Sequence, residues 1–313
     1  MRPLVIALLA SLLLVVLAPA GSAAAPQLEI RDTVAIPPLT VDGIQISELS
    51  GLAWDQDEQL LYAISDKGSL FHFKLSLKGN RIAAVDPVYA AKLTDKGGEP
   101  VKKGRRDSEG LTVMNADNGK RGDTQLVIAF EGVPRIIRFT PQGRAISNIE
   151  LPAALQDRRA YQHGNDALES VTFHRRYGFI TAPEMPLKGQ PQNLHTLYST
   201  KGKRWSFMAH PAKNSGISGL ETLPDGNLLV MERAWSGIFN PLVVSLRYLD
   251  FKQCSKDGAC TAQDLKVLSS HLLVDNFEGL THIQGNQYLM VSDDGNEELL
   301  RTALTLFTLD LVK

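Results

Sequence analysis

The sequence has little of what marks the commoner classes of enzyme and nucleic-acid-binding protein. Lysine and arginine (33 residues) nearly balance aspartate and glutamate (34 residues), so the formal net charge of the 313-residue chain is −1. This balance argues against a nucleic-acid or an anionic-membrane partner. The sequence contains no H-E-x-x-H, P-loop or G-x-G-x-x-G motif, and "GISGL" at 216–220 lacks the second glycine of a G-x-S-x-G nucleophile elbow. Composition and known motifs therefore indicate no function by themselves.

Cysteine is also scarce. The only two, Cys254 and Cys260, are separated by the loop-like stretch "SKDGA". A zinc site usually needs four ligands at tighter spacings, so we do not expect this pair to bind metal. In an exported chain the pair predicts a small local disulfide.

Long apolar runs are missing after the N-terminus. Arg2 precedes an uncharged apolar run at 4–18, and small residues dominate 21–25. The run is too short and wrongly flanked for a membrane span, so it predicts a secretory signal peptide over residues 1–24, with an uncleaved anchor as the alternative. We therefore expect a periplasmic or secreted protein with no membrane segment after cleavage, and one domain over residues 25–313.

Internal self-similarity is the strongest signal in the sequence. Five segments share one pattern: "ELSGLAW" (48–54), "DSEGLTV" (107–113), "ALESVTF" (167–173), "GISGLETL" (216–223) and "NFEGLTHI" (276–283). Counted at Gly51, Gly110, Ser170, Gly219 and Gly279, the intervals are 59, 60, 49 and 60 residues. Each copy continues into a second run of Val, Ile, Leu and aromatic residues and then into weaker alternating runs, a pattern typical of short strands.

Four strands per repeated unit are typical of a β-propeller, whose blades stack around a central channel. Four complete units cover 47–274, and the fifth supplies three strands from 276 to 311. The stretch "QLEIRDTVAI" (27–36) can add the missing outer strand. The sequence therefore predicts an all-β, five-bladed β-propeller whose last blade is closed by an N-terminal strand, with six blades as the alternative.

The residue before the repeated Gly-Leu, which is Ser-Val in the third copy, carries a side-chain oxygen in every copy. Because the innermost strand of each blade begins at the channel mouth, these positions form a ring about the axis: Ser50, Glu109, Glu169, Ser218 and Glu278. Three carboxylates facing one another repel by roughly 4 kcal/mol per pair at 4 Å and an effective dielectric constant of 20. Ca²⁺ offsets such repulsion and accepts six to eight oxygens, whereas the lack of histidine disfavours zinc and copper. The alternative is that these are solvated turn residues.

The order Ser, Glu, Glu, Ser, Glu resembles the blade openings of the calcium-activated apyrases, secreted nucleotidases that are five-bladed propellers with one axial Ca²⁺. The likeness rests on "ALESVTF", "GISGLETLPDGNLLVMER" and "NFEGLTHI". The arrangement of "EGL" followed by "VSDDG" is similar to the bacterial phytase-like proteins described as esterase-like, which we take as the nearer relatives. The resemblance implies that the five ring residues surround Ca²⁺. It does not carry over an apyrase's substrate, because the strong matches are confined to the blade openings.

A hairpin brings the end of its second strand beside the start of its first, so further polar residues share the face of the ring. Asp66 and Glu131 are the candidate catalytic bases. Candidate substrate contacts are Lys67, Arg135, Glu184, Glu232, Arg233 and Asp293. A cation edged by acids and bases suits a small phosphorylated substrate, so we expect a Ca²⁺-dependent hydrolase of phosphoric esters or anhydrides. The alternative is a non-catalytic propeller in which Ca²⁺ is structural and the cleft binds a ligand or protein.

Overall fold

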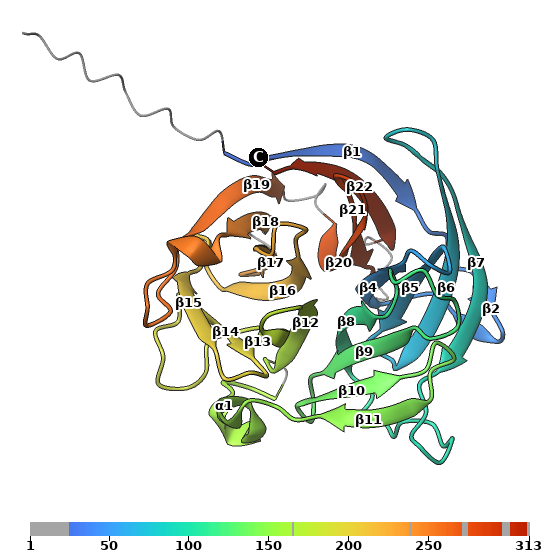
Figure 1. The fold of residues 1–313 in the computed structure, drawn as a ribbon, viewed down its shortest axis with the longest axis horizontal. Coiled ribbons are helices and arrows are strands. Elements are labelled where there is room, and N and C mark those ends of the chain that lie inside the picture. Colours follow the sequence, from blue (N-terminus) through green and yellow to red (C-terminus); the bar gives the residue numbers. More distant parts are fainter. Residues whose placement is uncertain (1–24, 165, 238–239, 271–274, 296–300, 312–313) are drawn as a thin grey trace, which may run out of the picture.

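The computed structural model describes residues 25–311 except 165, 238–239, 271–274 and 296–300. Within that part of the chain, five four-stranded antiparallel sheets surround a central axis (Figure 1). The predicted five-bladed β-propeller is confirmed, and the six-bladed alternative is wrong. The predicted signal peptide lies outside the described residues. No helix in the described ranges is long and apolar enough to cross a membrane.

In blades 1 to 4 the chain runs from the innermost strand to the outermost. Blade 1 contains β4 (Leu49–Asp55), β5 (Leu60–Ser65), β6 (Ser69–Leu77) and β7 (Ile82–Lys92). Blade 2 contains β8 (Ser108–Met114), β9 (Gln125–Phe130), β10 (Arg135–Phe139) and β11 (Ala145–Ile149). Blade 3 contains β12 (Leu168–His174), β13 (Gly178–Pro183), β14 (Leu194–Ser199) and β15 (Arg204–Met208). Blade 4 contains β16 (Ser215–Thr222), β17 (Leu228–Ala234), β18 (Leu242–Leu249) and β19 (Ala262–Ser270).

Blade 5 joins the two ends of the chain. It contains β20 (Asn276–Gln284), β21 (Gln287–Asp293) and β22 (Ala303–Asp310), and its outermost strand is β1 (Gln27–Ala35). The pairing runs from Gln27 opposite Asp310 to Ala35 opposite Ala303, which confirms the predicted closure by an N-terminal strand. This ladder ties the N-terminal segment, which continues into blade 1, to the C-terminal blade. A two-residue hairpin, β2 (Thr40–Val41) with β3 (Ile44–Gln45), connects β1 to blade 1.

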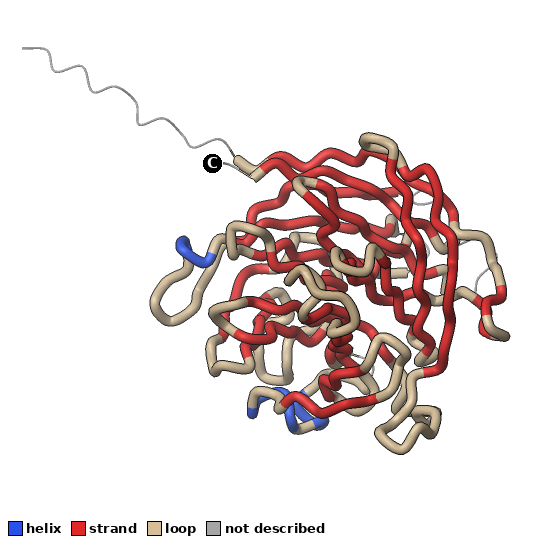
Figure 2. The backbone as a smooth tube through the Cα atoms, turned by 45° about the vertical axis from the view of Figure 1, so that its right-hand side comes forward, coloured by secondary structure: helices blue, strands red, loops and turns tan. Residues whose placement is uncertain are grey.

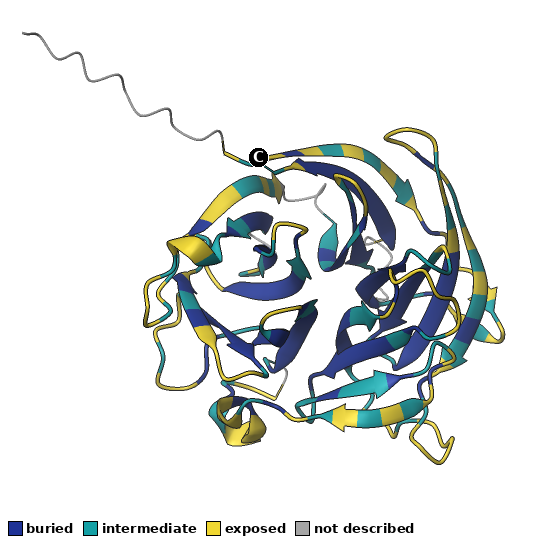
Figure 3. Cartoon of the chain, viewed as in Figure 1, coloured by how far each residue is buried: buried dark blue, intermediate teal, exposed yellow. Residues whose placement is uncertain are grey.

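Burial falls from the axis outwards, as Figure 3 shows. Every residue of β4 is buried because both faces of this strand are covered by neighbouring blades, whereas β11 alternates between half-buried and exposed positions. The buried apolar side chains form five clusters, and each cluster joins two adjacent blades. Leu52 of blade 1 and Leu289 of blade 5, for example, belong to one cluster. Packing between blades, more than packing within a blade, therefore forms the core.

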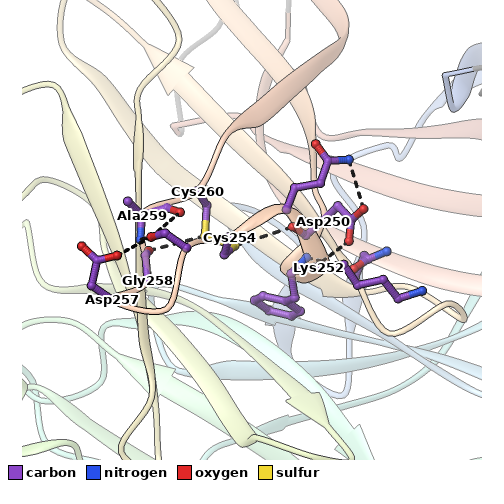
Figure 4. The surroundings of a disulfide bond; sticks show 11 residues. Asp250, Lys252, Cys254, Asp257, Gly258, Ala259 and Cys260 are labelled. Carbon is purple, nitrogen blue, oxygen red and sulfur yellow. Dashed lines mark hydrogen bonds between the residues drawn. A yellow bond between two sulfur atoms is a disulfide. The ribbon is translucent and has the colours of Figure 1, made fainter. Parts of the chain in front are cut away.

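The few helical turns lie at the periphery (Figure 2). They are α1 (Ala153–Gln156), η1 (Arg158–Ala160) and η2 (Phe251–Gln253). The predicted disulfide between Cys254 and Cys260 is confirmed, and it closes the loop that follows η2 (Figure 4). Both cysteines pack against the core cluster between blades 3 and 4. The disulfide thus fixes an outer loop and lies apart from the axis.

Candidate functional site

A β-bulge marks the ring position in all five innermost strands. In β4, Leu49 pairs with Ser65 and Gly51 with Ile64, so Ser50 is an extra residue without a partner on β5. The register of the other inner strands shifts at the equivalent point. A bulge bends its strand and re-aims the side chain of the extra residue. The repeated sequence pattern is therefore a repeated bulge that sets the direction of the ring side chains.

The glycine after the ring residue allows the inner strands to approach one another. A Cβ atom on Gly110 would lie 2.6 Å from the backbone of Ser170, and one on Gly51 would lie 2.8 Å from the Glu109 carbonyl oxygen. A Cβ atom on Gly279 would lie 2.9 Å from the Cα atom of Gly51. Because no side chain fits at these distances, glycine keeps the ring narrow.

The five predicted ring residues line one small cavity on the axis, together with the two residues that follow each of them. Its volume is about 10 Å³, close to the space that one water molecule needs. Ser50 and Ser218 are 2% exposed, Glu109 7% and Glu169 8%, and the Glu278 side chain is 11% exposed. The structure therefore brings the five residues together. These five are not solvated turn residues, because four of them are buried and the Glu278 side chain is only 11% exposed.

Burial and mutual repulsion dominate the electrostatics of the ring. Burial, followed by the charges of neighbouring carboxylates, raises the pKa values of Glu109 and Glu169 well above their ordinary range. Burial also raises the pKa of Glu278 to about 7, although the charge of Arg233 opposes the rise. The raised pKa values mean that the carboxyl groups do not readily ionise together. A cation among them would stabilise their ionised forms.

A second tier of carboxylates lies against the ring on blades 2 and 3. Ligand oxygens of Asp107, Glu109 and Glu131 lie within 4.8 Å of one another, and so do those of Glu131, Glu169 and Glu184. Glu131, which both groups share, is 5% exposed, and burial followed by the charge of Asp107 raises its pKa to about 8. Sequence reasoning missed Asp107, whose only signal is its place two residues before Glu109 in "DSEGLTV".

Serine hydroxyls complete the axial cavity. The Oγ atoms of Ser218 and Ser170 are buried and have no hydrogen-bond partner in the described part of the chain, whereas Ser50 Oγ donates to the Ser108 carbonyl oxygen. A buried polar atom without a partner costs about 1–3 kcal/mol. Hydroxyl oxygens keep lone pairs for a cation, so a ligand in the cavity would remove this cost.

Arg233 spans the mouth of the channel. Its Nη2 atom donates to Glu184 Oε1 at 3.0 Å, and its Nη1 atom donates to Glu278 Oε1 and to Asn276 Oδ1. Arg233 therefore joins blade 4 to blades 3 and 5, and its guanidinium is committed to protein partners. Asp293 lies beside this group, where it accepts a hydrogen bond from the Gly295 backbone nitrogen at 2.8 Å, and burial raises its pKa.

Asp66 and Lys67 lie in the turn between β5 and β6. Lys67 Nζ forms an ion pair with Glu48 and lies 3.9 Å from Asp66 Oδ1. The Asp66 side chain is 37% exposed, and its Oδ1 atom has no hydrogen-bond partner among the described residues. Burial, followed by the charge of Glu48, raises the pKa of Asp66 to about 6. Both residues occupy the rim where the sequence predicts them.

Two of the predicted substrate contacts, Arg135 and Glu232, instead contact other groups of the protein. The Arg135 guanidinium stacks 4.0 Å from the Phe130 ring centroid and donates to the carbonyl oxygens of Val133 and Arg105. Glu232 is 0% exposed, forms an ion pair with Arg247 at 2.7 Å and accepts hydrogen bonds from the Ser215 hydroxyl and the His210 backbone nitrogen. The position of Glu232 does not fit a substrate contact, because its oxygens are used inside the blade. Successive side chains on β17 alternate between faces, so Arg233 alone reaches the axis.

Comparison with known proteins assigns this architecture to a family. The model of the Phytase-like family, described as "Esterase-like activity of phytase", matches residues 44–296. The chain belongs to this family. The match includes all five ring residues and the second tier of acids, so the phytase-like region and the candidate site coincide. The suspected resemblance to phytase-like proteins is confirmed.

Other comparisons give only distant similarity to this phytase-like chain. No curated protein matches it significantly. Among solved structures, the PQQ-bound aldose sugar dehydrogenase from Streptomyces coelicolor is 11% identical, with a TM-score of 0.48 over 92% of this chain and 99% of that one. The Dos1 propeller is 12% identical, with a TM-score of 0.35 over 83% of this chain and 68% of that one. Neither similarity bears on activity.

Proposed function

We propose that this phytase-like protein is an exported, Ca²⁺-dependent hydrolase of phosphoric esters or anhydrides. The convergence of five oxygen-bearing side chains on one axial cavity, four of them buried and Glu278 nearly so, carries the proposal. A second tier of acids beside the cavity and cationic side chains near it suit an anionic substrate held by a metal and by side chains together.

The residues present fit Ca²⁺. The donors are carboxylates and hydroxyls, the hard ligands that Ca²⁺ accepts in loose geometry, and the site contains no histidine or cysteine. The unpartnered Ser218 Oγ and the raised pKa values of Glu109 and Glu169 both favour a cation there. Ser50, Glu109, Glu169, Ser218 and Glu278 would hold the ion, with Glu131 and Asp107 beside it. A bound Ca²⁺ would neutralise charge on the phosphoryl oxygens.

Of the two candidate bases, Asp66 suits the role better. It is partly exposed, and its pKa of about 6 leaves it mostly ionised at neutral pH, so it can accept a proton from a water molecule. The water oxygen then bonds to phosphorus, the bond to the leaving oxygen breaks, and that oxygen takes a proton from solvent. Glu131 is buried within both acid groups, where it holds the neighbouring carboxyls in position.

A non-catalytic propeller pinned by Ca²⁺ is the second candidate. The small volume and deep burial of the axial cavity favour it, because a fully enclosed ion would join five strands and leave little room for substrate. In that case the mouth would bind a ligand or a protein without changing it.

Phosphate release separates the two functions. We expect the purified protein, only with Ca²⁺, to release phosphate from nucleotides or phytate, or the alcohol from a phosphodiester, and a chelator to abolish the release. Glu169→Gln should abolish release and Asp66→Asn should reduce it at least tenfold. The exposed Glu150→Gln and Asp86→Asn are matched controls that should keep full activity. No release from any substrate, combined with a higher melting temperature in Ca²⁺, would establish the binding propeller.

A further inference from the structure

Three cations lie close together beside the acids of the site. They come from three segments: Lys67 in the β5–β6 turn, Lys92 at the end of β7, and Arg106 in the segment before β8. We propose that Lys67, Lys92 and Arg106 form a subsite that binds a phosphate group. The role of this subsite in catalysis rests on the proposed function, because it would hold the substrate beside Asp66.

The backbone brings the three residues together. Lys92 is the register partner of Ser69, and its Nζ atom donates to Ser69 Oγ at 2.7 Å. The Leu93 backbone nitrogen donates to the Gly68 carbonyl oxygen at 2.9 Å, which fixes the end of β7 to the turn that carries Lys67.

Arg106 packs directly on the same turn. A Cβ atom on Gly68 would lie 2.9 Å from the Cβ atom of Arg106 and 3.1 Å from its carbonyl oxygen. Gly68 also has a φ of +67°, a conformation that other residues rarely adopt. Glycine at this position therefore allows Arg106 to lie against the lysine-bearing turn.

The charges of the three residues are only partly compensated. Lys67 forms ion pairs with Glu48 and Asp66, but no carboxylate in the described ranges forms an ion pair with Lys92 or Arg106. Burial lowers the pKa of Lys92, and the charges of Arg106 and Lys67 lower it further. Like charges that lie close together repel, and a bound anion offsets this repulsion. Charge-assisted hydrogen bonds to phosphate are also stronger than hydrogen bonds between neutral groups.

The two neighbouring arginines are less suited to bind phosphate, because their guanidinium groups already donate to protein acceptors. Arg233 donates to Glu184, Glu278 and Asn276, and the Arg135 guanidinium donates to two carbonyl groups. The three-residue subsite also lies next to the acids of the site, because Asp66 precedes Lys67 and Asp107 follows Arg106 in the chain. A phosphate held there is adjacent to the candidate base and to the second tier of carboxylates.

The test is titration calorimetry with inorganic phosphate, in chelator and again in Ca²⁺. We expect Lys92→Gln and Arg106→Gln each to weaken phosphate binding by about tenfold or more. Lys103→Gln, an exposed lysine of the same segment, should bind as the wild type does. Gly68→Ala should also weaken binding, because the new methyl group displaces Arg106 without removing a charge.

Phosphate binding and phosphoester hydrolysis are measured separately, so the subsite and the hydrolase proposal can fail independently. Unchanged phosphate affinity in both charge variants, or no phosphate binding by the wild-type protein, would overturn the subsite. Each variant should keep the wild-type increase in melting temperature in Ca²⁺, which shows that the fold and the ring are intact. If phosphate binding depends on Lys92 and Arg106 while no phosphoester is hydrolysed, the subsite stands and the hydrolase proposal fails.

Discussion

Arg233 donates a hydrogen bond from Nη2 to Glu184 Oε1 at 3.0 Å, so a cation of blade 4 is held against a carboxylate of blade 3 at the channel mouth. The same guanidinium also reaches Glu278 on blade 5. Burial opposes the ionised form of Arg233, but the charges of Glu278 and Glu184 outweigh that effect and raise its pKa. Arg233 is thus a structural counter-ion that offsets part of the acidic charge without any metal.

Removing this counter-ion should destabilise the metal-free protein. Arg233→Met leaves Glu184 and Glu278 without this partner, and breaking a partly buried ion pair costs less than the about 3–5 kcal/mol of a fully buried one. We expect a lower melting temperature in chelator and a larger increase on adding Ca²⁺ than in the wild type. Arg175→Met, which removes an exposed arginine, is the control. A melting temperature equal to that of the wild type in chelator would show that Arg233 does not balance the ring.

The metal-free protein should lose stability as the pH rises. Folding raises the pKa of Glu278 to about 7 and of Glu131 to about 8, above the 4.5 of an unfolded glutamate. The folded state therefore holds more protons, so the stabilisation is complete below pH 4.5 and is lost as the pH rises towards 8. Ca²⁺ replaces these protons and should reverse the trend. Melting temperatures measured between pH 5 and 8, in chelator and in Ca²⁺, check both trends. If the melting temperature depends on pH in the same way in chelator and in Ca²⁺, that result would contradict a cation site at the ring.

Glu232 should act on stability and not on substrate binding. Burial alone would raise its pKa, but His195 and Arg247 lower it to about 2, although His195 Nε2 lies 3.7 Å from Glu232 Oε2, too far for a hydrogen bond. Glu232→Gln should lower the free energy of unfolding by about 3 kcal/mol near pH 7, because it removes the fully buried one of the two carboxylates that pair with Arg247 and leaves only the half-exposed Asp264. Urea unfolding measures this loss. The KM of any activity should stay within twofold, and a large rise in KM would place Glu232 in the substrate site.

A methyl group at the axis should separate two blades. Gly110→Ala would place a Cβ atom 2.6 Å from the backbone of Ser170, so blades 2 and 3 must move apart and the ring must widen. We expect at least tenfold weaker Ca²⁺ binding by calorimetry, together with a lower melting temperature in chelator. Gly164→Ala, at an exposed glycine whose added methyl group meets only a side-chain end at 3.5 Å, should change neither.

The fold was largely predictable from the sequence because the repeat shows where each blade begins. The Gly-Leu position recurs at nearly constant spacing, and each copy precedes alternating apolar runs that can only pair as short strands. The stretch at 27–36 was predictable as the closing strand because blade 5 has only three other strands. The disulfide followed from the short spacing of Cys254 and Cys260.

The candidate site was predictable only in part. The ring residues were found because all five share one register, but Asp107 is outside that register and was missed. Glu232 and Arg233 are adjacent in the sequence, and only strand pairing decides that Arg233 reaches the axis while Glu232 turns into the blade. Lys92 is far from Lys67 in the chain, and β6–β7 pairing brings them to one turn.

The sequence by itself determined the number of blades, the closing strand and the positions that face the axis, because each of these depends on periodicity along the chain. The tertiary structure alone decided how charges are matched. Arg233 pairs with Glu184 of the next blade, Arg247 pairs with Glu232 inside blade 4, and Lys92 and Arg106 form no ion pair in the described ranges. The physical reason is that electrostatic interactions depend on distance and burial across the seams between blades, and no local pattern in the sequence records either quantity.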